Sequence, residues 1–345
     1  MAKPSYAIPS LISFGLMFAA GACSSGDSDG AMTSTATPAA SPAMMAGPTA
    51  PPEMASSAEP ARGTAPTEGS QEGPPVNVDL TPPPAASNGA PTGAPMPPSA
   101  AAPGETVPSA GCSSTAAVAS GRFTIDVAGN PRDYILALPQ GYDAARPYRL
   151  VFTWHPGGGT AQQTAGNYYG LQRLAANSTI FVSPEGIDNG WANTNGRDLA
   201  FFDAMLARFE GELCIDQNRI FSTGFSYGGM MSFTLGCGRA DVFRAIAPMS
   251  GALYSGCADG DAPVAMLGFH GTTDTVVPIA NGRRARDVIV ERDGCQPEAM
   301  AVQSNGCLGF QGCSEGHSVT WCEFNGGHMP APQSAQRIWD FFSQF

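Results

Sequence analysis

Hydrophobic and polar positions alternate in two short segments, residues 122–127 and 133–138. A period of two is typical of strands with one buried face, and the Gly-Asn-Pro at 129–131 between them is typical of a turn. These segments predict an antiparallel pair of strands.

Further along, short apolar runs alternate with longer segments that favour helix. The predicted strands are residues 149–154, 179–183, 220–223, 244–249, 264–269 and 318–324. The predicted helices are residues 168–176, 198–213, 227–237, 279–291 and 334–342. Strands that alternate with helices indicate a mostly parallel sheet covered on both faces. The expected fold class is α/β, with a mostly parallel central sheet and an antiparallel N-terminal opening.

Residues 24–111 lack these patterns and contain no Phe, Trp or Tyr, while residues 1–111 hold 20 of the 31 prolines. Such a segment buries too little apolar area to offset the entropy of ordering, and its prolines favour an extended tether. We expect a disordered linker over 24–111. Residues 112–345 are long enough to bury the core of one domain.

The first 23 residues predict export. Lys3 precedes an apolar stretch, residues 8–20, which is too short to span a bilayer. Ala20-Gly21-Ala22-Cys23 has the form of a bacterial lipobox, although Leu is usual at the position of Ala20. We expect a lipoprotein-type signal peptide with lipidation at Cys23, and an ordinary secretory peptide is the alternative. The expected location is outside the cytoplasm, anchored to a bacterial outer membrane or cell surface only through this lipid.

Charge and cysteine usage restrict the partners. The net charge is −12, and all fifteen basic residues after position 111 are Arg, against 21 acidic residues. A polyanion would be repelled, so no nucleic-acid partner is expected. Eight of the nine cysteines lie in 112–345, and an even number in an exported chain favours disulfides. No Cys-x-x-Cys pair occurs, so we expect no metal site. We also expect no cofactor. The domain is expected to be a monomer.

The motif with the clearest chemistry is Gly224-Phe225-Ser226-Tyr227-Gly228, which fits G-x-S-x-G. It lies between a predicted strand and a predicted helix, where this motif turns the backbone sharply and exposes the serine hydroxyl. The sequence therefore predicts Ser226 as a nucleophile. The backbone N–H of Tyr227 is the first expected oxyanion donor.

A serine nucleophile needs a histidine to take its proton and a carboxylate to orient that histidine. His328 follows the last predicted strand and precedes the last helix, as the chain order Ser, acid, His requires, and its rivals are His270 and His317. Asp274 follows a predicted strand in a loop and is the expected acid. The other acids considered are Asp259, Asp261 and Asp287.

The loop after the strand that ends at Trp154 is rich in glycine and is expected to supply the second oxyanion donor. The choice of donor among Gly157, Gly158 and Gly159 stays open. His155 is expected to shape this loop and is a candidate substrate contact. The candidates for an aromatic acyl pocket are Trp191, Tyr227 and Phe225, with core packing as the alternative role.

Several motifs occur together: Arg-Pro-Tyr at 146–148, Gly-Trp-Ala-Asn-Thr-Asn-Gly at 190–196 with Asp198 and Phe201, Gly224-Phe225-Ser226 with Gly228-Gly229, His270-Gly271 with Asp274, and Gly326-Gly327-His328. In these motifs the chain resembles type C feruloyl esterases, which are related to extracellular polyhydroxybutyrate depolymerases and to carbohydrate esterase family 1. The resemblance covers about residues 112–345. It implies an α/β-hydrolase fold and a Ser226–Asp274–His328 triad that hydrolyses the ester between ferulate and plant cell-wall polysaccharide.

The resemblance also implies disulfides, in the pairs Cys214–Cys257, Cys112–Cys237 and Cys295–Cys313, and it leaves Cys307–Cys322 as an added pair. Pro156-Gly157-Gly158 departs from the family, which often has Trp or Arg in this loop, so the acyl pocket is expected to differ. Two alternatives stay open. The ester could be a polyhydroxyalkanoate polyester or an acetylated xylan, or the chain could be a catalytically silent adhesion lipoprotein.

Overall fold

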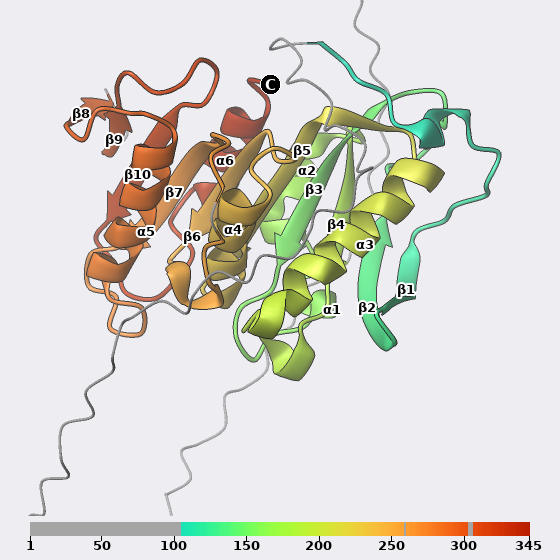
Figure 1. Ribbon diagram of the computed structural model, residues 1–345, viewed down its shortest axis with the longest axis horizontal. Coiled ribbons are helices and arrows are strands. Elements are labelled where there is room, and N and C mark those ends of the chain that lie inside the picture. Colours follow the sequence, from blue (N-terminus) through green and yellow to red (C-terminus); the bar gives the residue numbers. More distant parts are fainter. Residues whose placement is uncertain (1–104, 259, 303–305) are drawn as a thin grey trace, which may run out of the picture. The chain divides into compact units, whose positions relative to one another are not determined.

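The computed structural model describes residues 105–258, 260–302 and 306–345 (Figure 1). The predicted signal peptide with Cys23 lies outside these residues, as does the linker up to residue 104. In the described residues no helix is long and apolar enough to cross a bilayer.

A ten-stranded sheet, counted over the described residues, runs through the domain in the order β1-β2-β4-β3-β5-β6-β7-β10-β9-β8 (Figure 1). Its strands are β1 Gly121–Val127, β2 Asn130–Ala137, β3 Tyr148–Trp154, β4 Thr179–Pro184, β5 Ile215–Phe225, β6 Ala245–Met249, β7 Ala265–Gly271, β8 Ala299–Val302, β9 Cys307–Phe310 and β10 Val319–Phe324. The six strands from β4 to β10 in this order are parallel, and β1, β2, β9 and β8 pair antiparallel at the two edges. The expected α/β class with its antiparallel opening is confirmed.

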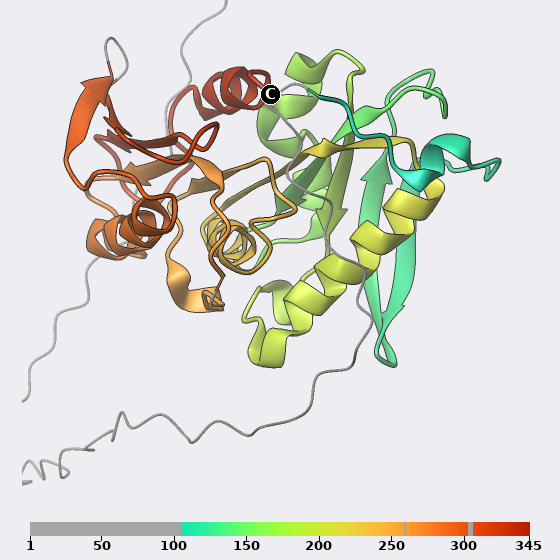
Figure 2. The same cartoon turned by 45° about the horizontal axis from the view of Figure 1, so that its top comes forward.

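The helices lie on both faces of the sheet, as predicted. They are α1 Ala161–Ala165, α2 Leu171–Ala175, α3 Arg197–Glu212, α4 Tyr227–Gly238, α5 Ile279–Arg292 and α6 Ser334–Phe342. Side chains from α3, α4 and α5 share one core, and side chains from α2 and α6 share another across the sheet. Figure 2 shows α6 on the opposite side of the sheet from α3. Central strand β3 serves both cores, because Leu150 and Phe152 face the first and Val151 faces the second.

Some elements differ from the predicted ones because they are short or polar. The predicted helix 168–176 begins as a 3₁₀ turn at Tyr168–Gly170, and only α2 is α-helical. Helix α1 was not predicted, although Thr160 and Gln163 form its capping box. Strands β8 and β9 are four residues each and were also missed. Strand β5 begins five residues before the predicted start, where polar side chains hide the pattern.

Residues 105–111, which the sequence assigns to the linker, pack on the folded domain. Val107 N–H donates to Asp216 Oδ1 at 3.0 Å, and Ser109 Oγ donates to the Leu213 carbonyl at 2.6 Å. This attachment uses hydrogen bonds rather than apolar side chains, so composition does not reveal it. The ordered domain begins before residue 112.

Four disulfides join cysteines of the described residues, and two of them are the expected pairs Cys295–Cys313 and Cys307–Cys322. Cys307 and Cys322 lie directly opposite each other on β9 and β10. This cross-link holds the edge hairpin to the strand that leads toward His328.

The other two expected disulfides are wrong, because Cys112 bonds to Cys214 and Cys237 bonds to Cys257. The 3₁₀ turn η1, Ala110–Ser113, lies against α3, and Cys214 follows the end of that helix. The end of α4 carries Cys237, and turn η5, Leu253–Ser255, packs along α4 two residues before Cys257. The pairing therefore follows contacts between neighbouring elements that spacing does not show.

Asp293, just after α5, is a fully buried carboxyl group. Its Oδ1 accepts a hydrogen bond from Val264 N–H at 3.0 Å, while Oδ2 has no partner among the described residues. Burial raises the pKa of Asp293 to about 7, and the Val264 bond opposes this only partly. The folded state thus favours the protonated form far more than the unfolded chain does.

We expect Asp293→Asn to stabilise the protein increasingly as pH rises from 5 to 8. A carboxyl whose folded pKa is raised contributes most stability below its unfolded pKa and loses that contribution as pH rises through about 7. Thermal unfolding at both pH values measures the difference in Tm from wild type. The exposed Asp188 gives the control, Asp188→Asn. An Asp293→Asn difference that is independent of pH would contradict this account.

Candidate active site

Ser226 lies at the sharp turn between β5 and α4, with φ 56° and ψ −117°. Its N–H donates to the Met249 carbonyl at 2.9 Å, which fixes the turn to β6. Glycine is required on both sides. A Cβ on Gly224 would lie 2.4 Å from the Gly228 carbonyl carbon, and one on Gly228 would lie 2.0 Å from the Trp154 carbonyl oxygen. Only bare backbone permits this approach of α4 to β3.

His328 lies between the two other predicted catalytic side chains. Its Nε2 is 2.7 Å from Ser226 Oγ, and its Nδ1 is 2.8 Å from Asp274 Oδ2. A carboxylate at Nδ1 places the ring proton there, which leaves Nε2 free to accept the serine proton. The sequence placed these three residues on separate loops, and the fold brings them into one hydrogen-bonded chain.

Asp274 is held in its ionised form. Burial alone would raise its pKa, but hydrogen bonds from His328 and from the N–H groups of Val277 and Val276 outweigh burial, so the pKa is lowered. Both N–H groups donate to Oδ1, at 2.8 and 2.9 Å, while Oδ2 serves His328. The acid therefore keeps its charge and its orientation when the pH falls.

The loops that carry Asp274 and His328 touch through their backbones. A Cβ on Gly271 would lie 2.3 Å from the Gly326 carbonyl oxygen, and Thr273 N–H donates to that same oxygen at 3.0 Å. The distance between the acid and the base is thus fixed by the backbone as well as by their own hydrogen bond.

The rival His270 contacts Asp274 but does not join the hydrogen-bonded chain of Ser226, His328 and Asp274. His270 is fully buried, donates through Nε2 to the Val277 carbonyl at 2.8 Å, and lies behind Asp274 at 3.5 Å from Oδ2. Burial lowers the pKa of His270, so the ring is neutral. Asp287 pairs with Arg286 on α5, and Asp259 lies outside the described residues.

The glycine loop leaves one N–H unused. Gly158 N–H donates to the Asn189 carbonyl and Gly159 N–H to the Pro156 carbonyl, both at 2.9 Å. Neither Gly157 N–H nor Tyr227 N–H has a hydrogen-bond partner within the described part of the chain. The Tyr227 ring also packs near Gly157, where an added Cβ would lie 3.5 Å from it. Of the three glycines that the sequence left open, Gly157 has the N–H available to a ligand.

His155 and Trp191 do not have the exposure that a substrate contact needs, which corrects that expectation. Both are 0% exposed. Trp191 Nε1–H donates to the His155 carbonyl at 2.9 Å, and Gly186 N–H donates to His155 Nε2 at 2.9 Å. His155 Nδ1–H in turn donates to the Pro156 carbonyl at 2.8 Å. These two buried residues therefore support the start of the glycine loop through hydrogen bonds to the carbonyls of His155 and Pro156.

The Gly-Trp-Ala-Asn-Thr-Asn-Gly segment depends on a buried ion pair that the sequence did not assign. Asp198 accepts from Arg132 at 2.9 Å and from Asn193 N–H at 2.7 Å, and Asn193 Oδ1 accepts from Asp198 N–H at 3.1 Å. Asn193 Nδ2 reaches the Ser255 carbonyl at 3.2 Å. The motif therefore joins the start of α3 to the loop after β6.

Apolar residues adjoin Ser226, Asp274 and His328 along the chain. Phe225, expected in the acyl pocket, lies with its ring 4.9 Å from the His328 ring. Val276, two residues after Asp274, is 65% exposed, and Met329, next to His328, is 48% exposed. Two exposed apolar side chains thus adjoin the acid and the base.

Comparison with known proteins gives relatives for most of the described domain. Residues 202–300 match the family described as Phospholipase/Carboxylesterase. Feruloyl esterase D of Neurospora crassa is 43% identical over 263 residues, covering 69% of this chain and 91% of that protein. Feruloyl esterase C of Emericella nidulans is 42% identical over 229 residues, covering 62% of this chain and 84% of that protein.

Among solved structures, an acetyl xylan esterase from Aspergillus awamori superimposes with a TM-score of 0.53 at 14% identity. The alignment covers 64% of this chain and 99% of that chain. At such low identity this likeness shows the fold alone.

We expect Gly228→Ala to abolish most esterase activity, because its Cβ would collide with the Trp154 backbone and displace the serine turn. Gly211→Ala is the matched control, since Gly211 is exposed in α3 with nothing within 4 Å of an added Cβ. That control should keep full activity and gain about 0.5–1 kcal/mol of stability. Hydrolysis of p-nitrophenyl acetate and thermal unfolding measure both effects. Wild-type activity in Gly228→Ala would contradict the packing argument.

Proposed function

The chain belongs to the feruloyl esterases, a family of carboxylic ester hydrolases with the α/β-hydrolase fold, and from this we propose that it hydrolyses hydroxycinnamate esters on plant cell-wall polysaccharide. The observation that carries the proposal is the hydrogen-bonded chain Asp274–His328–Ser226, with links of 2.8 and 2.7 Å. A serine next to a carboxylate-oriented histidine is the arrangement required for acyl transfer.

In the first half of the proposed reaction, Ser226 Oγ attacks the ester carbonyl and gives its proton to His328 Nε2. The carbonyl oxygen becomes negative and accepts hydrogen bonds from Gly157 N–H and Tyr227 N–H, neither of which has a hydrogen-bond partner among the described residues. The sugar oxygen then leaves with the proton from His328, and the acyl group stays on Ser226. Asp274 remains ionised and stabilises the transient imidazolium.

In the second half, His328 takes a proton from a water molecule, and the resulting hydroxide attacks the acyl-enzyme carbonyl. The same two N–H groups bind the second oxyanion. Collapse of this intermediate returns the proton to Ser226 Oγ and releases the hydroxycinnamic acid. The reaction consumes only the ester and one water molecule, and Ser226 and His328 return to their starting states.

The surroundings of the site support an acyl group with a hydrophobic body. Val276, two residues after Asp274, and Met329, directly after His328, are exposed. Large exposed apolar side chains next to a reactive centre favour binding of an aromatic ring or alkyl chain over binding of a small acetyl group.

We also propose that the protein works outside the cytoplasm. The support is the set of four disulfides in the described domain, since such bonds persist in oxidising compartments. Lipidation at Cys23 as a bacterial outer-membrane or surface anchor is part of this proposal and rests on the sequence motif alone.

A panel of esters tests the substrate class. For each ester, kcat/KM is divided by the rate constant of its uncatalysed hydrolysis, which corrects for the different reactivities of the esters. This normalised kcat/KM should be higher for methyl ferulate than for p-nitrophenyl acetate. A hydroxybutyrate oligomer should be a poor substrate. Preference for the hydroxybutyrate oligomer would instead indicate a polyester depolymerase, and preference for acetylated xylan would indicate an acetyl esterase.

A further inference from the structure

A loop of three consecutive glycines, Gly157, Gly158 and Gly159, carries the proposed second oxyanion donor. Glycine has more backbone freedom than any other residue, so such a loop does not hold one N–H direction by itself. An oxyanion donor gains its effect from being fixed before the reaction. Contacts from outside the loop must therefore fix these peptide groups.

Asn189 provides two of those contacts. Its backbone carbonyl accepts from Gly158 N–H at 2.9 Å, and its side-chain Nδ2 donates to the Gly159 carbonyl at 2.9 Å. Asn189 thus binds two consecutive glycines, as an acceptor to Gly158 and as a donor to Gly159. Together with the bond from Gly159 N–H to Pro156, these bonds use the N–H groups of Gly158 and Gly159 and leave that of Gly157 without a partner in the part of the chain that the structure describes.

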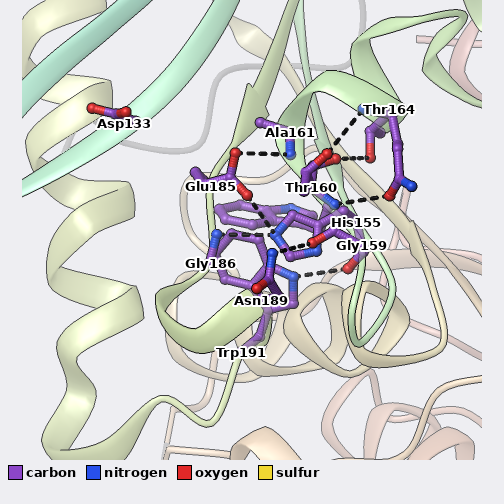
Figure 3. A network of polar contacts seen from close by, with 12 residues as sticks. Asp133, His155, Gly159, Thr160, Ala161, Thr164, Glu185, Gly186, Asn189 and Trp191 are labelled. Atoms are coloured by element: carbon purple, nitrogen blue, oxygen red, sulfur yellow. Dashed lines mark hydrogen bonds and ion pairs between the residues drawn. The ribbon is translucent and has the colours of Figure 1, made fainter.

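Asn189 is itself held in place by neighbouring structure (Figure 3). It has φ 52° at the end of turn η3, Ile187–Asn189, a left-handed conformation that asparagine tolerates. Gly186, just before this turn, donates to His155 Nε2, and His155 Nδ1–H donates to Pro156 in the glycine loop. Burial lowers the pKa of His155, so the ring stays neutral and Nε2 remains an acceptor. The segment 186–189 and the glycine loop thus support each other at both ends.

We propose that Asn189 is a positioning residue, whose side-chain amide keeps the Gly157 N–H directed at the substrate carbonyl oxygen. It touches no reacting atom and acts through the glycine loop. This inference rests on the proposed serine esterase function, because only that function gives the Gly157 N–H a role.

Asn189→Gly is the direct test, because glycine adopts a positive φ freely and keeps the backbone carbonyl that binds Gly158 N–H. Only the side-chain bond to Gly159 is lost. We expect kcat for methyl ferulate and for p-nitrophenyl acetate to fall roughly tenfold, with KM little changed. The decrease is smaller than for removal of an oxyanion donor, because the Gly157 N–H is still present but less well oriented. Inhibition by phenylboronic acid, which forms a tetrahedral adduct with serine, should weaken by a similar factor. Inhibition by the product ferulate should not change.

Asn195→Gly is the matched control. Asn195 has φ 56°, is exposed in turn η4, Thr194–Gly196, and its side chain has no hydrogen bond among the described residues. It should leave kcat and phenylboronic acid inhibition at wild-type values. Asn189→Asp, which places an oxygen against the Gly159 carbonyl, should reduce kcat further than Asn189→Gly, with Asn195→Asp as its control. This second pair keeps the test informative if Asn189→Gly fails to fold.

Labelling with a fluorophosphonate measures the concentration of active sites. It therefore distinguishes a variant with fewer folded molecules from a variant in which each active site has a lower kcat. Wild-type kcat and phenylboronic acid inhibition in both Asn189 variants would overturn the positioning role while leaving the esterase function intact. A wild-type protein in which fluorophosphonate does not label Ser226 would overturn the proposed function, and the positioning role with it.

Discussion

The close approach of α4 to the end of β3 is the constraint on which the site depends. A Cβ on Gly228 would lie 2.0 Å from the Trp154 oxygen and 2.9 Å from the His155 oxygen. This contact places the N-terminus of α4, with Tyr227 N–H, beside the glycine loop that follows β3. Ser226 and the Tyr227 N–H are therefore positioned by backbone packing, which reorganises little during a reaction, while the proposed donor Gly157 N–H lies in a loop that the Asn189 side chain also contacts.

The positions of Asp274 and His328 depend on two loops at the same edge of the sheet, those that follow β7 and β10. Backbone contact between Gly271 and Gly326 holds the loops after β7 and β10 together, and the His328–Asp274 hydrogen bond spans them. Buried neutral His270 supports the Asp274 loop from behind through Val277. Because the pKa of Asp274 is lowered, its charge is available to orient His328 over a wide pH range. Three parallel strands, β5, β7 and β10, thus each lead into one residue of the proposed triad.

Much of the fold could be predicted, as could the three residues of the Asp274–His328–Ser226 hydrogen-bonded chain, because each depended on a local pattern. Apolar runs predicted the parallel strands, and G-x-S-x-G between strand and helix predicted the turn at Ser226. Contacts between distant segments could not be predicted in this way. Three features depend on loops meeting in three dimensions: the pairing of Cys112 with Cys214, the Gly157 N–H that has no partner within the described residues, and the burial of Trp191. Asn189 was missed because a lone asparagine in a loop carries no sequence signal.

The central claim is that Ser226 is the group that becomes acylated. Ser226→Ala measures this most directly, with Ser343→Ala, an exposed position after α6, as the control. The account predicts that kcat on methyl ferulate falls by roughly a millionfold in Ser226→Ala, while fold and thermal stability are kept and the control is fully active. Retention of most of the wild-type rate in Ser226→Ala would contradict it.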